Sequence, residues 1–327
     1  MLKKGLKSLI CKLPNRIGEI FYHIYTYLKY IDMRQKKCKY GEKNKDKTFY
    51  IIRPRIDDIE GLMSLLLNVM KQLKYAEIHG FIPVVDFQNY NTQYKDEGIE
   101  EPNVWKYYFK QTSEYDLEEV YNSSNVILSG LNALIKVNRV IERSFETEII
   151  HNCRDVLKRY IRVSEDIYQI VEKEVAWDIS KTVGLYLRGT DYVKLKPAGH
   201  PRQPTFEQAR IEVDKLLNLY GLDYIFLVTE DEEIYQQARE YYQEKLKIVS
   251  FDKFVTGYEG KDYLSKSNEC MQELAETPYQ RGLNYLVKLL ILSKCRMFVG
   301  GNTCGSWAAC VFSKGYEKQY VFELGKY

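Results

Sequence analysis

The sequence predicts an α/β protein made of two doubly wound, Rossmann-like domains that face one cleft. Short apolar strands alternate with helices in two separate segments, and this alternation is typical of parallel βαβ units. The chain of 327 residues is long enough for two domains that each bury a core. We therefore expect a basic amphipathic segment at 1–48, a first α/β domain with a helical bridge at 49–176, and a second α/β domain at 177–327.

The first domain is predicted to begin with the strand TFYIIRP, which is rich in β-branched and aromatic side chains and ends at a proline. Leucines at helical spacing then predict a helix that ends at Gly80, and FIPVVDF follows as the next strand. The carboxyl ends of strands in such a βαβ unit face a cleft. The residues expected near these ends are Asp57, Asp58, Glu60, Gly61 and Asp86. Helix capping and turn formation would account for Asp57 and Asp58 equally well.

Residues 136–176 contain neither proline nor glycine and predict a continuous helical passage between the domains. The second domain then starts with KTVGLYLRGTDY, in which apolar residues alternate before a turn. Further strands are predicted in DYIFLVTED, LKIVSF and RMFVGG, with helices between them. The pattern predicts a second parallel sheet, with Arg188, Thr229 and Asp231 at its carboxyl ends.

The composition, with 45% hydrophobic and 28% charged residues, is that of a soluble globular protein, and no stretch approaches the roughly 20 apolar residues of a membrane span. Residues 1–50 contain 13 Lys/Arg and 4 Asp/Glu, whereas the remainder is net acidic. This basic front, with Phe21, Tyr22 and Tyr25 among its lysines, predicts contact with an anionic membrane surface. A solvated helix packed on the first domain is the alternative. No nucleic-acid-binding signature follows, so we expect no nucleic acid partner.

The seven cysteines include no CxxC pair and no histidine at zinc-binding spacing. Their odd number, and the lack of a secretory signal, favour free thiols in a reducing compartment. We therefore expect a cytoplasmic protein with peripheral contact at the inner membrane face and no bound metal.

The turn GGNTCGS, residues 300–306, predicts an anion site. It opens a helix after a strand, where unsatisfied backbone N–H groups and the helix dipole favour phosphate. It has neither the Walker A sequence nor the spacing of a dinucleotide fingerprint, and it would also serve as a simple tight connection. The residues expected around the anion are Gly301, Asn302, Thr303, Gly305 and Ser306.

Arg188 adds a planar cation at a strand end in the same domain. A guanidinium can place several donors on a diphosphate, and departure of a nucleoside diphosphate deposits negative charge that such a group stabilises. An ion pair with Asp191 across the turn is a compatible structural role. Two lobes with this anion site form the GT-B-like architecture of many nucleotide-sugar glycosyltransferases.

Three segments of the chain resemble the motifs of the GT-B fucosyltransferases that use GDP-fucose, the superfamily of α1,2-, α1,6- and protein O-fucosyltransferases. GLYLRGTDY resembles the first motif, IFLVTED the second, and FVGGNTCGSWA the third. EGLMSLLLNVMKQLKYAEIHGFIPVVDF also resembles the amino-terminal lobe of bacterial relatives encoded with capsule and surface-polysaccharide genes. The resemblance runs from about Phe49 to Phe312.

The resemblance implies an inverting, metal-independent fucosyltransferase with GDP-fucose as donor and a glycan or lipid-linked glycan as acceptor. The first domain would then hold the acceptor and the second the nucleotide sugar. Arg188 matches the family's arginine that contacts the diphosphate, and Thr303 lies in its phosphate-binding turn. Asp191, Thr229 and Asp231 lie in the first two motifs and are expected on the donor side.

The chain departs from the family pattern at three places. The family histidine before the arginine is Tyr186, and the family's second arginine is Gly189. No acidic residue occurs at 277–296, where relatives place a carboxylate that binds guanine, and Lys288 lies near that position. These departures keep two alternatives open: a glycosyltransferase that uses another nucleotide sugar, and an inactive relative that binds glycan or nucleotide as a scaffold.

The catalytic base is expected in the loop that follows the first motif. His200 lies there, and a histidine whose pKa is near the working pH can take the proton of the acceptor hydroxyl. A structural role for this loop histidine, capping the next helix, is the simpler alternative. Glu60 and Asp86, from the other domain, are the competing candidates for the base.

Overall fold

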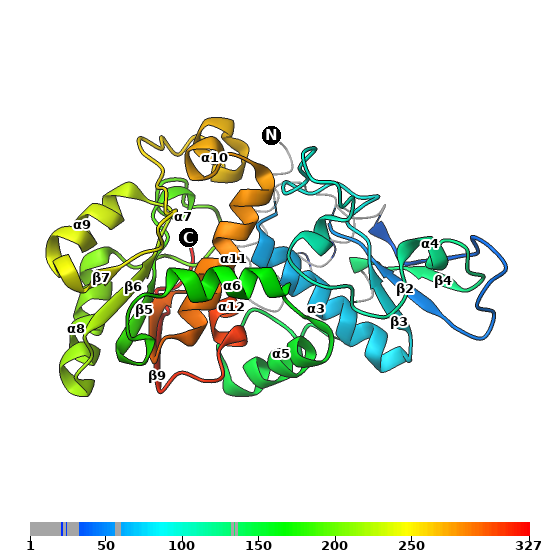
Figure 1. The fold of residues 1–327 in the computed structure, drawn as a ribbon, viewed down its shortest axis with the longest axis horizontal. Coiled ribbons are helices and arrows are strands. Elements are labelled where there is room, and N and C mark those ends of the chain that lie inside the picture. The colour runs from blue at the N-terminus through cyan, green and yellow to red at the C-terminus, as the bar shows by residue number, and fades with distance from the viewer. Residues whose placement is uncertain (1–20, 22–23, 25–32, 56–59, 132–133, 135–136) are drawn as a thin grey trace.

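The computed structural model describes residues 21, 24, 33–55, 60–131, 134 and 137–327. Two α/β lobes lie side by side, each built on its own sheet (Figure 1). Of the basic segment predicted at 1–48, the structure describes residues 21, 24 and 33–48, and strand β1 (Lys36–Cys38) within it belongs to the first lobe; the rest, and Asp57 and Asp58, lie outside the described residues.

The first lobe is built on a four-stranded sheet with the order β1-β4-β2-β3. Its strands are β1 (Lys36–Cys38), β2 (Phe49–Ile52), β3 (Ile82–Val85) and β4 (Val126–Leu128). The central strand β2 pairs in parallel with β3 and β4, which confirms the predicted parallel sheet. The short strand β1 pairs antiparallel with β4, and the sequence did not predict it because KKC is polar and largely exposed.

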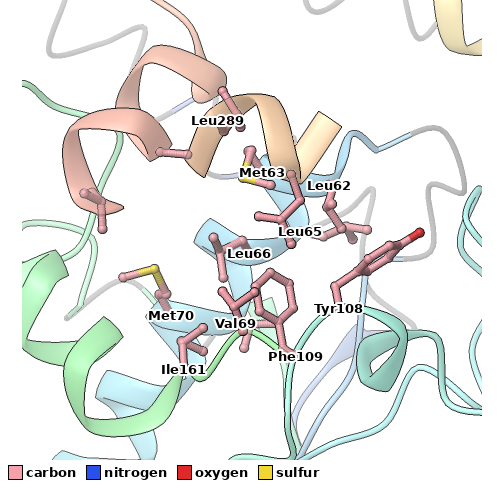
Figure 2. Packing of buried hydrophobic residues seen from close by; sticks show 14 of the residues in the cluster. Leu62, Met63, Leu65, Leu66, Val69, Met70, Tyr108, Phe109, Ile161 and Leu289 are labelled. Carbon is pink, nitrogen blue, oxygen red and sulfur yellow. The ribbon is translucent and has the colours of Figure 1, made fainter. Parts of the chain in front are cut away.

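Helix α3 (Leu62–His79) connects β2 to β3, as the leucine spacing predicted. Its C-cap, Gly80, has a φ of 66°, a left-handed conformation that glycine adopts without strain. Figure 2 shows the apolar face of the helix, where Leu66 and Val69 point toward Phe109, while Met63 lies beside Leu289 of the second lobe. The same helix therefore fills the core of the first lobe and contributes to the junction between lobes. The smaller elements of this lobe are the 3₁₀ helix η2 (Val104–Tyr107) and α4 (Leu117–Val120).

The predicted continuous helical bridge is wrong, because it consists of two helices, α5 (Thr147–Tyr160) and α6 (Glu165–Glu174). Between them the backbone is extended, and Val163 pairs with Phe109 in an isolated β-bridge. Burial of Ile161 and Val163 against the first lobe interrupts a sequence that has no helix breaker. The two helices pack on the second lobe, α5 against α12 and α6 against α11.

The second lobe contains a five-stranded, wholly parallel sheet with the order β7-β6-β5-β8-β9. This order, with helices on both faces, confirms the doubly wound α/β prediction. The strands are β5 (Thr182–Tyr186), β6 (Tyr224–Val228), β7 (Leu246–Lys247), β8 (Met297–Gly301) and β9 (Lys318–Phe322). The longer helices are α8 (Phe206–Tyr220), α9 (Glu232–Tyr242), α11 (Pro278–Lys294) and α12 (Cys304–Phe312). The shorter ones are η4 (Ile179–Lys181), α7 (Thr190–Lys194), η5 (Gln243–Lys245), η6 (Leu264–Lys266) and α10 (Asn268–Leu274).

The alternation in β5 separates two cores. Val183 and Leu185 belong to the cluster that also contains residues of α8 and α9, whereas Tyr186 belongs to the cluster of α11 and α12. Gly184 faces α11, where a Cβ would lie 2.9 Å from Leu292. A small residue at this position therefore allows close packing of helix on strand.

In the part of the chain that the structure describes, no helix is long and apolar enough to cross a membrane. Over the same residues, no group of three or more His, Cys, Asp or Glu side chains is arranged to hold a metal ion. The six cysteines described are all free thiols: Cys38, Cys153, Cys270, Cys295, Cys304 and Cys310.

Candidate active site

A cavity of about 780 Å³, here called the cleft, lies between the lobes. The first lobe contributes the segments around Glu60 and Tyr94, and the second contributes the ends of β5 and β6, one face of α11 and the start of α12. The carboxyl ends of the β5–β9 sheet therefore open into it, as expected for a doubly wound sheet.

Arg188 lies in the cleft directly after β5. Its guanidinium donates to Asp191 at 2.7 Å and lies 4.8 Å from the centre of the Tyr192 ring. Its Nε is 3.4 Å from a carboxylate oxygen of Glu230 but makes no hydrogen bond. Burial alone would lower the pKa of Arg188, yet Asp191 and Glu230 raise it well above the ordinary value. The predicted ion pair with Asp191 is present, and a permanently charged donor faces the cavity.

The predicted phosphate turn reaches the cleft through the first residues of α12. Thr303 is the N-cap of this helix, and its hydroxyl accepts from the Ser306 amide at 3.1 Å. Thr303, Cys304 and Gly305 line the cavity. The amides of a first helical turn have no partner within the helix, so this end of α12 can receive an anion.

Three other residues of the turn do not line the cavity. Ser306 is fully buried, with its hydroxyl 3.2 Å from that of Thr303. Gly301 faces Gln203, whose amide oxygen occupies the space a Cβ would need. Asn302 is partly buried, and its side-chain oxygen makes no hydrogen bond. Their place is behind the first turn of α12, where they support its position.

The two residues predicted from the second motif lie in different places. Thr229 lines the cleft, whereas Asp231 caps α9 by accepting from the amides of Glu233 at 2.9 Å and Ile234 at 3.1 Å. The carboxylate of Asp231 also fills the space beside Gly189, so a Cβ at that glycine would clash with it. This contact explains why a larger residue, such as the second arginine of the resembled motif, does not fit there.

Tyr186 occupies the position of the family histidine and lines the cleft. Its hydroxyl is 3.1 Å from that of Tyr285, and burial raises the pKa of Tyr186 to about 12. The ring is therefore a neutral hydrogen-bonding group and does not titrate near pH 7.

Lys288, on α11, also lines the cleft and donates to Asp252 at 2.7 Å. The Asp252 side chain is 1% exposed, and burial raises its pKa despite the opposing effect of Lys288. The sequence drew attention to Lys288 but not to Asp252, because 36 residues separate the partners and no motif links them.

On the first-lobe side, Glu60 and Gly61 both line the cleft. Glu60 accepts from the Arg55 Nε at 2.8 Å and from the Ser64 hydroxyl, and its side chain is 5% exposed. Gly61 is the N-cap residue of α3 and has no neighbour within 4 Å of the position of a Cβ.

Asp86 lies away from the cleft and is fully buried. Its carboxylate accepts from the amides of Gln88 and Asn89, from the Asn89 side chain and from the Tyr121 hydroxyl. The expectation that it faces the cleft ligand is therefore not met. The strand end was predicted correctly, but the carboxylate turns back to hold the loop that follows it.

His200 lines the cleft on the second-lobe side, as the loop position predicted. Its ring centre is 5.2 Å from that of Tyr192 and 6.2 Å from that of Tyr263. Arg188 lies over the same Tyr192 ring, so the imidazole and the guanidinium share one aromatic neighbour.

The charged residues that line the cleft are mostly cations. Sequence reasoning missed Arg55 and Arg281, which have no motif around them. The cationic side chains of the lining are Arg55, Arg188, Lys196, Arg281 and Lys288. The carboxylates are Glu60, Asp191 and Glu230. The lining thus has a positive excess, which favours an anionic ligand.

No family model matches the chain, and no curated protein matches it by sequence. Among solved structures it is similar to fucosyltransferase NodZ from Bradyrhizobium, at 14% identity and a TM-score of 0.46 over 80% of this chain and 92% of that one. It is similar to POFUT1 in complex with GDP, at 11% identity and a TM-score of 0.46 over 85% and 99% of the two chains. It is similar to an Arabidopsis thaliana FUT1 mutant in complex with GDP, at 10% identity and a TM-score of 0.43 over 98% and 78%.

Proposed function

We propose that the chain is an inverting, metal-independent glycosyltransferase that transfers fucose from GDP-fucose to a glycan acceptor. This proposal rests on one observation. Arg188 and the first turn of α12 line the same cleft between two α/β lobes. A guanidinium and unpaired helix amides are the groups that bind a diphosphate. In this assignment residues 49–176 hold the acceptor and residues 177–327 hold the donor.

In the proposed reaction the acceptor hydroxyl oxygen attacks the anomeric carbon of the donor sugar. The bond from that carbon to the diphosphate oxygen breaks, and the electron pair leaves with the nucleoside diphosphate. A single displacement of this kind inverts the anomeric configuration. Arg188, the Thr303 hydroxyl and the amides of α12 would stabilise the negative charge that develops on the leaving group. The cations of the cleft would supply this stabilisation without a divalent metal.

The proton of the acceptor hydroxyl needs a base, and we assign this role to His200. The imidazole lines the cleft and shares the Tyr192 ring with Arg188. In a single displacement the base acts on the face of the sugar opposite the diphosphate, so the assignment requires the sugar to lie between His200 and the diphosphate. Glu60 is the alternative from the opposite lobe. Its carboxylate oxygens already accept from Arg55 and from the Ser64 hydroxyl, so they are less available to the acceptor hydroxyl.

Lys288 affects which nucleobase the donor nucleotide can carry. Its ammonium group can donate to the oxygen of guanine but cannot accept from the ring N–H, as a carboxylate does. The second candidate function, within the same enzyme class, is therefore a glycosyltransferase whose donor carries a nucleobase other than guanine. The candidate from a different class is a scaffold that binds nucleotide or glycan without turnover. The absence of an arginine at Gly189, where Asp231 leaves no space for a side chain, favours this candidate.

We further propose that the acceptor is a glycan or lipid-linked glycan in bacterial capsule or other surface polysaccharide synthesis. The chain would then work in the cytoplasm, with its basic front on the inner membrane face. The sequence resemblance to enzymes of that setting supports this assignment. Vesicle sedimentation with anionic and neutral lipids, with and without residues 1–32, tests the membrane part.

The first experiment is calorimetric titration with GDP, UDP, CDP and GDP-fucose in the presence of a chelator. We expect GDP and GDP-fucose to bind, and Arg188→Ala to weaken GDP at least 30-fold, because several charge-assisted hydrogen bonds are lost. Arg210→Ala is the matched control, since Arg210 pairs with Glu207 on the surface and should leave affinity unchanged. Tight binding of UDP or CDP would favour a donor with another nucleobase. Failure to bind any of the nucleotides would contradict the enzyme proposal.

Turnover separates the enzyme from the scaffold. Slow hydrolysis of GDP-fucose to GDP and fucose can be followed without knowing the acceptor. We expect hydrolysis by the unaltered protein and loss in Arg188→Ala. Nucleotide binding with no turnover, either of donor alone or with a panel of glycan acceptors, would support the scaffold.

A further inference from the structure

A second cavity, of about 920 Å³, lies on the first lobe outside the cleft. Its most prominent lining residues are Tyr40, Tyr90, Tyr115 and Tyr121, and we call this cavity the tyrosine groove. We infer that the tyrosine groove binds uncharged sugar units of the acceptor glycan, beyond the unit that reacts in the cleft. This inference rests on the proposed function and extends it by a second binding site.

The chemistry of the groove matches that of a pyranose. A sugar ring has a face of C–H groups that packs on an aromatic ring, and a rim of hydroxyls that both donate and accept hydrogen bonds. Beside its tyrosines the groove has the amide side chains of Gln88 and Asn89 and the carboxylates of Glu114 and Glu118. Amides and carboxylates can form hydrogen bonds with two neighbouring hydroxyls at once. The tyrosine rings can therefore pack on the C–H face of the sugar while these polar groups bind its hydroxyls.

Packing contacts hold three of the four tyrosine rings in place before any ligand arrives, and the Arg53 guanidinium lies 5.5 Å from the centre of the fourth ring, that of Tyr90. Tyr121 donates to Asp86 at 2.7 Å, and the Tyr40 ring packs edge-on against it with centroids 4.9 Å apart. Tyr115 packs edge-on against buried Phe49 at 5.0 Å. Rings with fixed positions lose little conformational entropy when a ligand binds.

Asp86 has a place in this arrangement. Its carboxylate joins Tyr121 to the turn that carries Gln88 and Asn89, so one buried group positions lining residues from two separate segments. A fully buried carboxylate is costly unless it is well bonded, and here four hydrogen bonds stabilise it. The carboxylate that does not face the cleft thus supports the tyrosine groove.

The charge of the groove selects against anionic ligands. Its acidic lining residues are Glu101, Glu114, Asp116 and Glu118. Lys106 is the cationic residue of the lining and is already paired with Glu101. Two further cations lie over the tyrosine rings, Lys47 over Tyr115 at 5.0 Å and Arg53 over Tyr90 at 5.5 Å. The carboxylates still exceed these cations, so the groove favours a neutral chain over a strongly anionic one.

The groove and the cleft share one loop. Gln88, Asn89 and Tyr90 line the groove, and Gln93 and Tyr94 line the cleft. Gln93 follows Tyr90 by three positions, so their Cα atoms are at most about 11 Å apart. An extended glycan can therefore occupy both sites at once, with its reacting end in the cleft.

Saturation-transfer NMR with maltohexaose, cellohexaose and laminarihexaose tests the inference, with hexagalacturonate as the anionic probe. We expect at least one neutral hexamer to bind and hexagalacturonate not to bind. Tyr90→Ala should weaken that hexamer at least fivefold, whereas Tyr90→Phe, which keeps the ring, should stay within twofold. Gln88→Ala, an exposed position, provides a second variant that should weaken binding without risk to folding.

GDP titration of the same samples separates this inference from the proposed function. Hexamer binding that Tyr90→Ala weakens while GDP affinity is unchanged supports the groove. If none of the neutral hexamers binds, if Tyr90→Ala and Gln88→Ala have no effect, or if hexagalacturonate binds best, the inference is wrong. A protein that binds the hexamer in the groove but no nucleotide would contradict the proposed function and leave the sugar site standing.

Discussion

Gly305, in the first turn of α12, lies directly against the phenol of Tyr186. A Cβ at Gly305 would come 2.5 Å from both Cζ and the hydroxyl oxygen of that ring. Tyr186 is itself fixed by burial and by the Tyr285 hydroxyl at 3.1 Å. The place of the proposed anion-binding turn is therefore set by the residue at the end of β5, two positions before Arg188.

Gly305→Ala should lower the free energy of unfolding by about 1–3 kcal/mol, because the added methyl group forces the turn away from Tyr186. The same displacement should weaken GDP binding. Urea denaturation and calorimetry measure the two effects. A Cβ at Gly305 would also lie 2.6 Å from the Tyr285 hydroxyl. In a background that carries both Tyr186→Ala and Tyr285→Phe, the alanine at 305 should therefore lower the free energy of unfolding much less. An equal cost in both backgrounds would contradict the steric explanation.

Lys288→Met should lower the free energy of unfolding by about 3–5 kcal/mol at pH 8, because it leaves the buried Asp252 carboxylate without its partner. Burial already raises the Asp252 pKa, and loss of the ammonium raises it further. For an acid whose pKa is raised by folding, stability is greatest below its unfolded pKa of about 4 and falls as the pH rises through its folded pKa.

The cost of Lys288→Met should therefore be smaller at pH 4.5 than at pH 8. Urea denaturation at the two pH values measures this difference. Adding Asp252→Leu removes the unpaired carboxylate and should restore most of the lost stability. A cost that is the same at both pH values would show that Asp252 is not its source.

Two helix caps should respond differently to substitution. Asp231→Ala removes the cap of α9 outside the cleft lining, so it should cost about 1 kcal/mol of stability and leave GDP affinity within twofold. Thr303→Val removes the cap of α12 and a hydroxyl in the cleft, so it should cost a similar stability and weaken GDP at least tenfold. Thr303→Ser keeps the hydroxyl, and with it both the cap and the cleft donor, and serves as the control. Equal GDP affinities in the two cap variants would contradict the phosphate site.

Asp86→Ala should destabilise the first lobe by about 2–4 kcal/mol, because four hydrogen bonds to a fully buried carboxylate are lost. GDP affinity at a temperature where the variant is folded should stay within twofold. Thermal unfolding and calorimetry measure the two quantities. A large loss of GDP affinity would instead place this carboxylate in the donor site.

Local patterns were sufficient for much of the fold. β-branched strands, helical leucine spacing and Gly80 as a C-cap predicted β2, α3 and β3, and the alternation in 181–192 predicted β5. These features depend on residues close together in sequence, whose periods and caps act before any tertiary contact forms. The interruption between α5 and α6 could not be predicted in this way, because it follows from the pairing of Val163 with Phe109, which lies far away in sequence.

The sequence by itself determined the parallel α/β architecture, the strand ends, and the presence of Arg188 and Thr303 after two of them, with His200 in the loop beyond the first. Only the tertiary structure decided which polar groups face the cleft. It turned Asp86 toward Tyr121, placed Asp231 against Gly189 and brought Asp252 to Lys288. The spacing of apolar residues and the helix caps specify where a side chain leaves the backbone. The partner of a buried charge, in contrast, comes from a distant segment that lies beside it only after folding.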